Sequence, residues 1–373
     1  MATENNNKTL NVPNLRFPEF SGEWERCSLG DITTNFSRRN KEEVRYPMFS
    51  VTNNRGFVPQ SEQFEDREMV GEDIKAYKII HKNDFAYNPA RINVGSIAKY
   101  NGGEPCMISS LYVCFTADKR LDNEWLMQLL KTPKMNFYYN INGEGGVRVY
   151  LFYPNFARIK TSFPSLQEQQ KISSFLALLD ERIATQIKII EKLESLIKGL
   201  CQKLTQQDNP NTALNDTLVC YSSTLQESSV QEAGDYPVYG ATGVCGYTDT
   251  PEVDGDSILI IKDGASVGVT YYASGKYSAI GTLNRLAAKR GYSLRYLYYC
   301  LKVFNFAPYR TGLAIPHIYF RDYGKAKVWC PSLDEQQRIA DALSKVELKI
   351  AIEKSLLEQL YSQKRFLLQA MFI

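Results

Sequence analysis

Apolar residues recur at alternating steps of three and four along two long segments of the chain. The first series is Ile172, Leu176, Leu179, Ile183, Ile190 and Leu193, and the second is Ile339, Leu343, Val346, Ile350, Leu357 and Leu360. This spacing predicts two helices with the seam of a coiled coil. Gln186 and Glu353 interrupt the two series at equivalent positions. A polar seam residue selects register and partner, so we expect the helices to pair with each other. The alternative is two ordinary amphipathic helices in a domain core.

The start of each helix is nearly the same sequence. P-S-L-Q-E-Q-Q-K-I, from Pro164 to Ile172, returns as P-S-L-D-E-Q-Q-R-I from Pro331 to Ile339, an offset of 167 residues. A serine followed three residues later by a glutamate fits a capping box, directly after a proline. Two copies of one helical design predict a duplicated scaffold, and a duplicated scaffold indicates one task performed at two places.

The regions that precede the two helices have a different pattern. They are rich in Tyr, Phe, Val, Gly and Asn, with short strand-like runs at 110–115 and 258–261 and helical patches at 123–130 and 294–301. They also resemble each other weakly, because 46–57 echoes 236–247 and 92–98 echoes 265–271. We therefore expect an α+β protein with a pseudo-two-fold internal repeat. The predicted divisions are a first domain at 1–163, a helix at 164–208, a second domain at 209–330 and a helix at 331–373.

Composition narrows the class of protein. With 373 residues and 44% hydrophobic content, the chain can bury at least two cores. No apolar run approaches the roughly 20 residues of a membrane span, and the Asn-rich start is not a signal peptide, so we expect a cytoplasmic protein. The eight cysteines form no C-x-x-C pair and only His81 and His317 are present. This favours reduced, mostly buried thiols and no metal site.

Motifs for catalysis are missing from the sequence. An adenine methyltransferase needs an N/D-P-P-Y/F tetrapeptide, and the nearest approach, 88–91 (N-P-A-R), is interpreted as a turn at the end of a strand. There is no G-x-x-x-x-G-K-[ST] loop for a nucleotide-driven motor. Asp254, Asp256 and Asp263 lie among turn residues, where Asp is favoured for backbone reasons. We expect no catalytic residue in this chain.

Three features together resemble the specificity subunit of type I restriction-modification systems. They are F-P-E-F-S-G-E-W-E-R-C-S-L-G-D-I at 17–32, Y-N-P-A-R-I-N-V-G-S-I-A at 87–98, and the two P-S-L-x-E-Q-Q helix starts. The resemblance implies two target recognition domains joined by two long, paired antiparallel helices that act as a spacer. It implies a subunit that reads a bipartite, asymmetric site in double-stranded DNA. It also implies docking of two methyltransferase subunits, which bind S-adenosylmethionine, and of two endonuclease/translocase subunits, which use ATP and Mg.

DNA readers need cationic or amide groups for phosphates and side chains with paired donors or acceptors for base edges. The first-domain candidates are Arg38, Arg39, Lys41, Asn53, Asn54, Arg55, Arg91, Asn93 and Arg148, and the second-domain candidates are Thr242, Lys262, Ser266, Lys276, Arg285, Arg310 and His317. For each of them the alternative is a solvated loop, and Arg285 could simply pair with nearby acids. Net charge is only +3, so a basic surface must come from arrangement. An alternative function is a non-catalytic coiled-coil scaffold whose two domains bind proteins or glycans.

Overall fold

The computed structural model describes residues 10–63, 74–145, 149–312 and 314–373. The chain divides into two compact units: Met1–Thr185 with Leu357–Ile373, and Gln186–Leu356. Each unit contains one α+β domain and part of two long helices, α6 (Leu166–Thr205) and α10 (Leu333–Ala370). We call them the first and second unit, and describe each by itself.

The first unit is built on a four-stranded antiparallel sheet of order β2-β9-β6-β7. Its strands are β2 (Thr33–Phe36), β9 (Val113–Ala117), β6 (Phe85–Tyr87) and β7 (Ile97–Lys99). Three antiparallel pairs surround it: β1 (Glu25–Ser28) with β10 (Lys160–Phe163), β3 (Phe49–Thr52) with β4 (Gly56–Pro59), and β5 (Lys78–Ile80) with β8 (Cys106–Ile108). The strand predicted at 110–115 corresponds to β9, which begins only at Val113. The residues before it form a turn, in which the Tyr112 N–H donates to the Ser109 carbonyl.

Short helices complete the first unit. They are α1 (Leu29–Ile32), α2 (Gln60–Gln63), η1 (Ile74–Ala76), η2 (Ile92–Val94), α3 (Asn123–Leu130), α4 (Pro133–Asn142) and α5 (Tyr153–Arg158). The predicted helix at 123–130 is confirmed as α3. It begins there because the Asp122 carboxylate accepts the N–H of Trp125, the usual role of an N-cap residue.

The second unit contains a four-stranded sheet whose strand order matches that of the sheet in the first unit. Its sheet β12-β19-β16-β17 consists of β12 (Leu218–Ser222), β19 (Leu283–Ala288), β16 (Ser257–Ile261) and β17 (Thr270–Ala273). A second sheet, β14-β13-β18-β15, consists of β14 (Gly243–Thr248), β13 (Tyr236–Gly240), β18 (Lys276–Ala279) and β15 (Val253–Asp254). The remaining elements are β11 (Thr212–Ala213) paired with β20 (Lys327–Val328), α7 (Leu214–Thr217), η3 (Glu227–Ser229), α8 (Leu294–Lys302), η4 (Ala307–Tyr309) and α9 (Phe320–Tyr323).

The predicted strand at 258–261 and the predicted helix at 294–301 are confirmed as β16 and α8. All five residues of β16 are buried, which explains the apolar run that follows its first residue, Ser257. The tyrosines of α8 belong to the core of this unit, where Tyr296 and Tyr299 are fully buried beside Ile258. The tyrosine-rich character of α8 thus reflects packing against the sheet.

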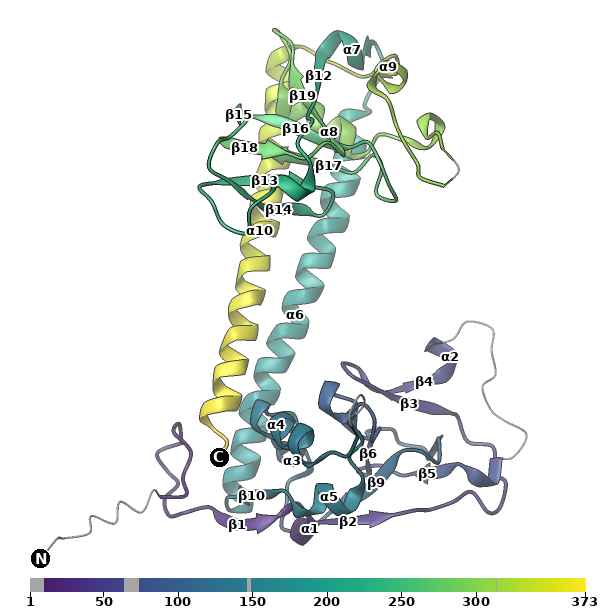
Figure 1. Ribbon diagram of the computed structural model, residues 1–373, viewed down its shortest axis with the longest axis vertical. Helices are drawn as coiled ribbons and strands as arrows, with labels where there is room; N and C mark the ends of the chain where they lie inside the picture. Colours follow the sequence, from purple (N-terminus) through teal and green to yellow (C-terminus); the bar gives the residue numbers. More distant parts are fainter. Residues whose placement is uncertain (1–9, 64–73, 146–148, 313) are drawn as a thin grey trace, which may run out of the picture. The chain divides into compact units, whose positions relative to one another are not determined.

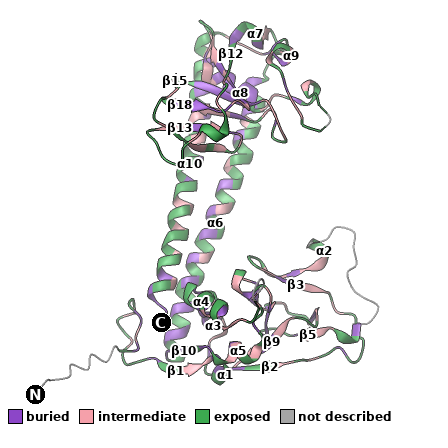
Figure 2. Cartoon of the chain, viewed as in Figure 1, coloured by how far each residue is buried: buried purple, intermediate pink, exposed green. Residues whose placement is uncertain are grey.

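Within each unit, the segments of α6 and α10 lie side by side and antiparallel (Figure 1), and buried positions recur along one face of each helix (Figure 2). The predicted seam residues Leu193, Val346, Leu357 and Leu360 are partly buried, and the others are buried: Ile172, Leu176, Leu179, Ile183, Ile190, Ile339, Leu343 and Ile350. No helix in the described part of the chain is long and apolar enough to cross a membrane.

The two polar seam residues contact each other in the second unit. The Gln186 amide nitrogen donates to the Glu353 backbone carbonyl over 3.1 Å and also to the Glu353 carboxylate. Both side chains are buried, and Lys349 forms an ion pair with the same carboxylate. An offset by one turn would remove the hydrogen bonds between the two buried side chains, so this contact selects one register.

Both long helices begin as the repeat predicts, with one difference. The Ser165 and Ser332 hydroxyls accept the N–H of Glu168 and Glu335, each over 3.4 Å. The Glu168 carboxylate, however, accepts hydrogen bonds from Arg16 and the indole of Trp24. It is buried by the N-terminal segment, which the capping-box interpretation did not anticipate.

The cysteines are structural thiols. None of the eight forms a disulfide, and all eight lie in described parts of the chain. Burial raises the pKa of the Cys106 and Cys114 thiols to about 12, so both stay protonated near neutral pH.

Candidate nucleic-acid interface

Two loops of the second unit bring four of the predicted DNA-binding residues together. The first loop, 262–269, joins β16 to β17, and the second, 310–318, precedes α9. Backbone hydrogen bonds tie them: Gly264 N–H donates to the Pro316 carbonyl and Ile318 N–H to the Lys262 carbonyl, both over 2.9 Å. Lys262, Ser266, Arg310 and His317 therefore lie on one two-loop platform, which we call the second-unit platform.

A hydrogen bond to a carboxylate orients the imidazole on this platform. His317 Nδ1 lies 2.7 Å from Asp263 Oδ1, and about a third of each side chain is exposed. Arg310 donates from Nη2 to the Val267 carbonyl over 3.1 Å, which leaves its remaining donors for another partner. Sequence analysis had treated Asp263 only as a turn residue. The two members of the pair are 54 residues apart, so no local pattern signals their contact.

The other three candidates of this unit lie elsewhere. Thr242 is exposed on the turn between β13 and β14, and Lys276 begins β18 with its ammonium 5.8 Å from the centre of the Tyr236 ring. The Arg285 guanidinium stacks 4.0 Å from the centre of the Tyr221 ring and donates to the Ser257 hydroxyl over 3.4 Å. The described partners of Arg285 are thus an aromatic ring and a hydroxyl, not the acids considered from the sequence.

The first unit presents a similar pair of segments. The turn between β3 and β4 carries Asn53, Asn54 and Arg55 with exposed side chains, and the loop between β6 and β7 carries Arg91 and Asn93. Gly95 in that loop has a φ of +98°, and a Cβ there would lie 2.9 Å from the Asn53 carbonyl oxygen. The Ser96 hydroxyl donates to the Val51 carbonyl over 2.7 Å. The structure therefore places these two segments against each other, which we call the first-unit platform.

The side chains on the first-unit platform differ in whether they already contact another side chain of the chain. Asn93 donates to the Asn140 side chain over 3.0 Å, and Arg55 forms an exposed ion pair with Glu62 at 2.8 Å. Arg91 is exposed at the start of η2. The N-P-A-R turn is confirmed, because the Asn88 side chain accepts the Ala90 N–H directly after β6.

The basic cluster after β2 is divided by the fold. Arg38 donates to Asp84 over 2.8 Å, where the carboxylate is 6% exposed, and its guanidinium lies 4.6 Å from the centre of the Phe36 ring. The positive charge of Arg38 is therefore paired with the nearly buried Asp84 carboxylate within the domain. Arg39 and Lys41 are exposed. Arg148 lies outside the described residues.

The loops that carry candidates in both units are the same element of a repeated fold. β6-loop-β7 and β16-loop-β17 occupy the third and fourth places of sheets with matching order. Gly95 and Gly268 both have left-handed φ, +98° and +91°, two residues before the next strand. Glycine is favoured at such positions because a side chain would be strained. The weak echo between 92–98 and 265–271 therefore marks a shared turn that carries different side chains.

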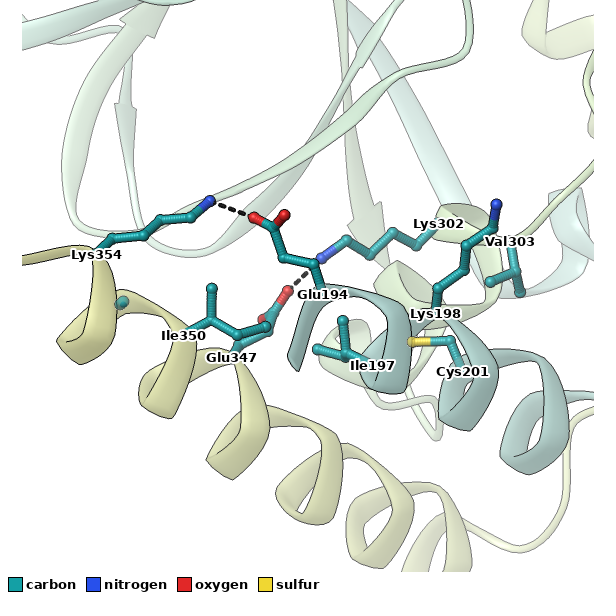
Figure 3. Close-up of a pocket in the computed structure, with 10 residues that line it drawn as sticks. Glu194, Ile197, Lys198, Cys201, Lys302, Val303, Glu347, Ile350 and Lys354 are labelled. Carbon is teal, nitrogen blue, oxygen red and sulfur yellow. Dashed lines mark hydrogen bonds and ion pairs between the residues drawn. The ribbon is translucent and has the colours of Figure 1, made fainter. Parts of the chain in front are cut away.

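Each unit also has a groove where its domain helix meets the long helices. In the second unit a cavity of about 540 Å³ has an apolar floor that includes Ile197 and Ile350. Figure 3 shows charged side chains at its edge, with Lys354 paired to Glu194 and Lys302 paired to Glu347. In the first unit a cavity of about 640 Å³ is lined by residues at the same repeat positions. Offsetting by 167 relates Glu194, Ile197, Lys198 and Cys201 to Tyr361, Lys364, Arg365 and Leu368.

No cluster of three or more metal-binding side chains occurs among the residues that the structure describes. The candidate side chains on the two platforms carry amides, a hydroxyl, guanidinium groups, an ammonium and an imidazole, beside the Asp263 carboxylate. These are the groups that contact phosphates and base edges in DNA complexes.

Comparisons with known proteins identify the family of the chain. The family model "Type I restriction modification DNA specificity domain" matches residues 22–195 and 221–362. A putative type I specificity subunit of Mycoplasma pneumoniae is 26% identical over 57% of this chain and 61% of its own length. The putative MjaX specificity subunit of Methanocaldococcus jannaschii is 23% identical over 53% of this chain and 49% of its own length. The chain thus matches less than two thirds of either relative.

Among solved structures, the S subunit of a type I restriction-modification system from M. genitalium has the same fold. It superposes with a TM-score of 0.63 over 97% of this chain and 99% of that one, at 17% identity. Because the family model matches both halves and most of the length, the chain belongs to the type I restriction modification DNA specificity domain family.

Proposed function

We propose that this chain is the DNA sequence-recognition subunit of a type I restriction-modification enzyme, with one half of a bipartite, asymmetric target read by each unit. It has no catalytic activity of its own. Methylation and cleavage belong to partner subunits, which supply S-adenosylmethionine binding in one case and ATP and Mg binding in the other.

The observation that carries this proposal is the pair of platforms. Equivalent loops on equivalent sheets carry Arg91 and Asn93 in one unit and Lys262 and Ser266 in the other. A shared scaffold with unlike side chains suits two readings of the same kind at two different sequences. Arginine and lysine pair with guanine and asparagine pairs with adenine, whereas serine contacts either purine, so the two sets of side chains suit different bases.

The repeated groove supports two copies of a partner. Both grooves lie beside the last residue or C-cap of a domain helix, Lys302 and Lys131, and both combine apolar with basic residues. One protein surface would fit both in the same way. We propose that these grooves lie within the docking surfaces of two methyltransferase subunits, with two endonuclease/translocase subunits joining that complex. Native mass spectrometry of the assembled enzyme counts the copies.

The experiment that tests the function is methylome sequencing of a host that carries the enzyme with the wild-type chain or with Arg91→Ala. The wild type should methylate a split site with a non-specific gap. The variant should relax one half-site and leave the other unchanged, because each good bidentate contact contributes about 1–3 kcal/mol of base discrimination. Arg26→Ala, which removes an equally exposed arginine from β1, is the matched control.

Three outcomes would contradict the proposal. A single continuous methylated motif would exclude two separate readers. An unchanged methylome without this chain would remove its role in DNA recognition and favour the scaffold that binds proteins or glycans. The purified chain alone should neither methylate nor cleave DNA, and activity that survives removal of the partner subunits would contradict the non-catalytic assignment.

A further inference from the structure

The repeated helix start contains one glutamine that is fully buried in both copies. Gln169 is 0% exposed and Gln336 is 1% exposed, although each lies in the first turns of a long helix next to an exposed glutamine, Gln170 or Gln337. Glutamine is seldom buried unless its amide has partners. Helix formation alone does not require these two side chains to be buried, so their hydrogen-bond partners have to account for it.

The two amides make the same two contacts. Gln169 donates from Nε2 to the Pro164 carbonyl over 2.9 Å, and its Oε1 accepts the Asp122 N–H over 2.7 Å. Gln336 donates to the Pro331 carbonyl over 2.9 Å and accepts the Ser293 N–H over 2.9 Å. Gln169 also donates to the Arg120 carbonyl over 3.1 Å.

These contacts join two separate parts of each unit. Pro164 and Pro331 precede the long helices, whereas Asp122 and Ser293 are the N-cap residues of the domain helices α3 and α8. One side chain therefore holds the start of a domain helix against the start of a long helix. Only an amide of this length supplies both a donor and an acceptor here, since glutamate lacks the donor and methionine lacks both.

We propose that Gln169 and Gln336 are positioning residues that fix the angle between each recognition domain and its long helix, and so set which gap length the enzyme accepts between its half-sites. This inference rests on the proposed DNA-reading function. A change of one base pair in the gap moves one half-site by about 3.4 Å along the duplex and also rotates it about the duplex axis. A domain held by a rigid joint cannot follow such a movement, and a domain with a loosened joint can.

The two joints are not equally supported by other polar contacts. In the second unit, Arg295 donates to Ser344 over 3.1 Å, Tyr299 to Glu347 over 2.8 Å, and Lys302 pairs with Glu347 at 2.5 Å, all from α8 to α10. In the first unit, α3 adds a long hydrogen bond of 3.5 Å from Gln128 to Asp180 on α6, while Arg16 and Trp24 of the N-terminal segment contact Glu168 at the start of α6. Because the contacts of Glu168 do not involve α3, loss of the amide should loosen α3 from its long helix more than α8 from its own.

The test compares Gln169→Met and Gln336→Met with the adjacent exposed residues changed in the same way, Gln170→Met and Gln337→Met. Methylomes of hosts that carry each assembled enzyme give the preference for the wild-type gap over gaps one base pair longer or shorter. We expect Gln169→Met to lower this preference about tenfold, the ratio that corresponds to about 1.4 kcal/mol, with both half-site sequences unchanged. Gln336→Met should lower it less, and the controls should leave it unchanged.

The outcomes separate this inference from the proposed function. If the wild type shows no split site, the proposed function fails. If the split site is present and Gln169→Met lowers total methylation with an unchanged gap preference, the glutamine is only structural and the inference is overturned. If the enzyme with Gln169→Met does not assemble, the Gln169→Glu variant is tested instead. The measurement is the affinity of the purified complex for duplexes that differ only in the length of the gap. That variant keeps the acceptor for Asp122 N–H, and an unchanged preference would overturn the inference.

Discussion

The two units build the same central sheet and the same joint to a long helix, yet they differ in what surrounds them. The orders β2-β9-β6-β7 and β12-β19-β16-β17 match strand for strand, and the two buried glutamines share two of their contacts, one to the proline before the long helix and one to the N-cap residue of the domain helix. The β3–β4 hairpin is a two-stranded pair, whereas the corresponding β13–β14 hairpin belongs to a four-stranded sheet through the parallel pairing of β13 with β18.

A second difference lies at the start of the long helices. In the first unit the N-terminal segment covers this region, with Leu15 N–H donating to the Ala370 carbonyl over 2.8 Å and Arg16 pairing with Glu168. In the second unit the equivalent glutamate, Glu335, pairs with Arg338, which is 78% exposed. The comparison teaches that positions joining domain to helix are kept in both copies, while peripheral contacts have diverged.

The largest expected effect concerns the ends of the two long helices. Phe372 and Thr205 occupy the same repeat position, but Phe372 is buried against Trp125, with ring centres 5.8 Å apart, whereas Thr205 lies beside Cys300. Phe372→Ala should destabilise the first unit by about 4 kcal/mol, because it opens a cavity beside an aromatic core. Thr205→Ala should cost about 1 kcal/mol, the scale of its hydrogen bond to the Cys201 carbonyl. Urea unfolding measures both, and equal effects would contradict the asymmetry.

An intermediate effect is expected at the glutamate of the repeated motif. Glu168→Ala leaves Arg16, 16% exposed, without its partner in a nearly buried site and should cost about 3 kcal/mol. Glu335→Ala removes an ion pair with an exposed arginine and should cost at most about 1 kcal/mol. Urea unfolding of each variant measures both costs. A similar cost at both positions would mean that the N-terminal segment adds nothing to the first unit.

The smallest expected effect tests whether the equivalent seam residues act as a pair. Gln186→Leu or Glu353→Leu alone should destabilise by about 1–3 kcal/mol, because each removes the hydrogen bond between two buried polar side chains. The double substitution should be close to neutral, since two leucines fill an apolar seam. Urea unfolding of the four proteins forms a double-mutant cycle. Additive costs would show that Gln186 and Glu353 do not select register through their contact.

Much of the scaffold was predictable because its signals are local. The three-four spacing from Ile172 onward and the polar position at Gln186 indicate a paired helix whatever surrounds it, since side chains at this spacing share a face. The match between the two helix starts indicates duplication without any structure. The strand at 258–261 was equally predictable from the sequence, because a short run of apolar residues alone is typical of a strand buried on both faces.

The arrangement of the candidate site was decided by the tertiary structure. The sequence identified residue types suited to DNA. It did not show that Lys262, Ser266, Arg310 and His317 share one platform, or that Arg38 forms an ion pair with Asp84. It placed Gln169 in a motif, but not against Asp122, which is 47 residues away. Such contacts depend on how sheets, loops and helices pack. Local periodicity therefore determined the helices and their repeat, whereas non-local packing alone determined which side chains meet.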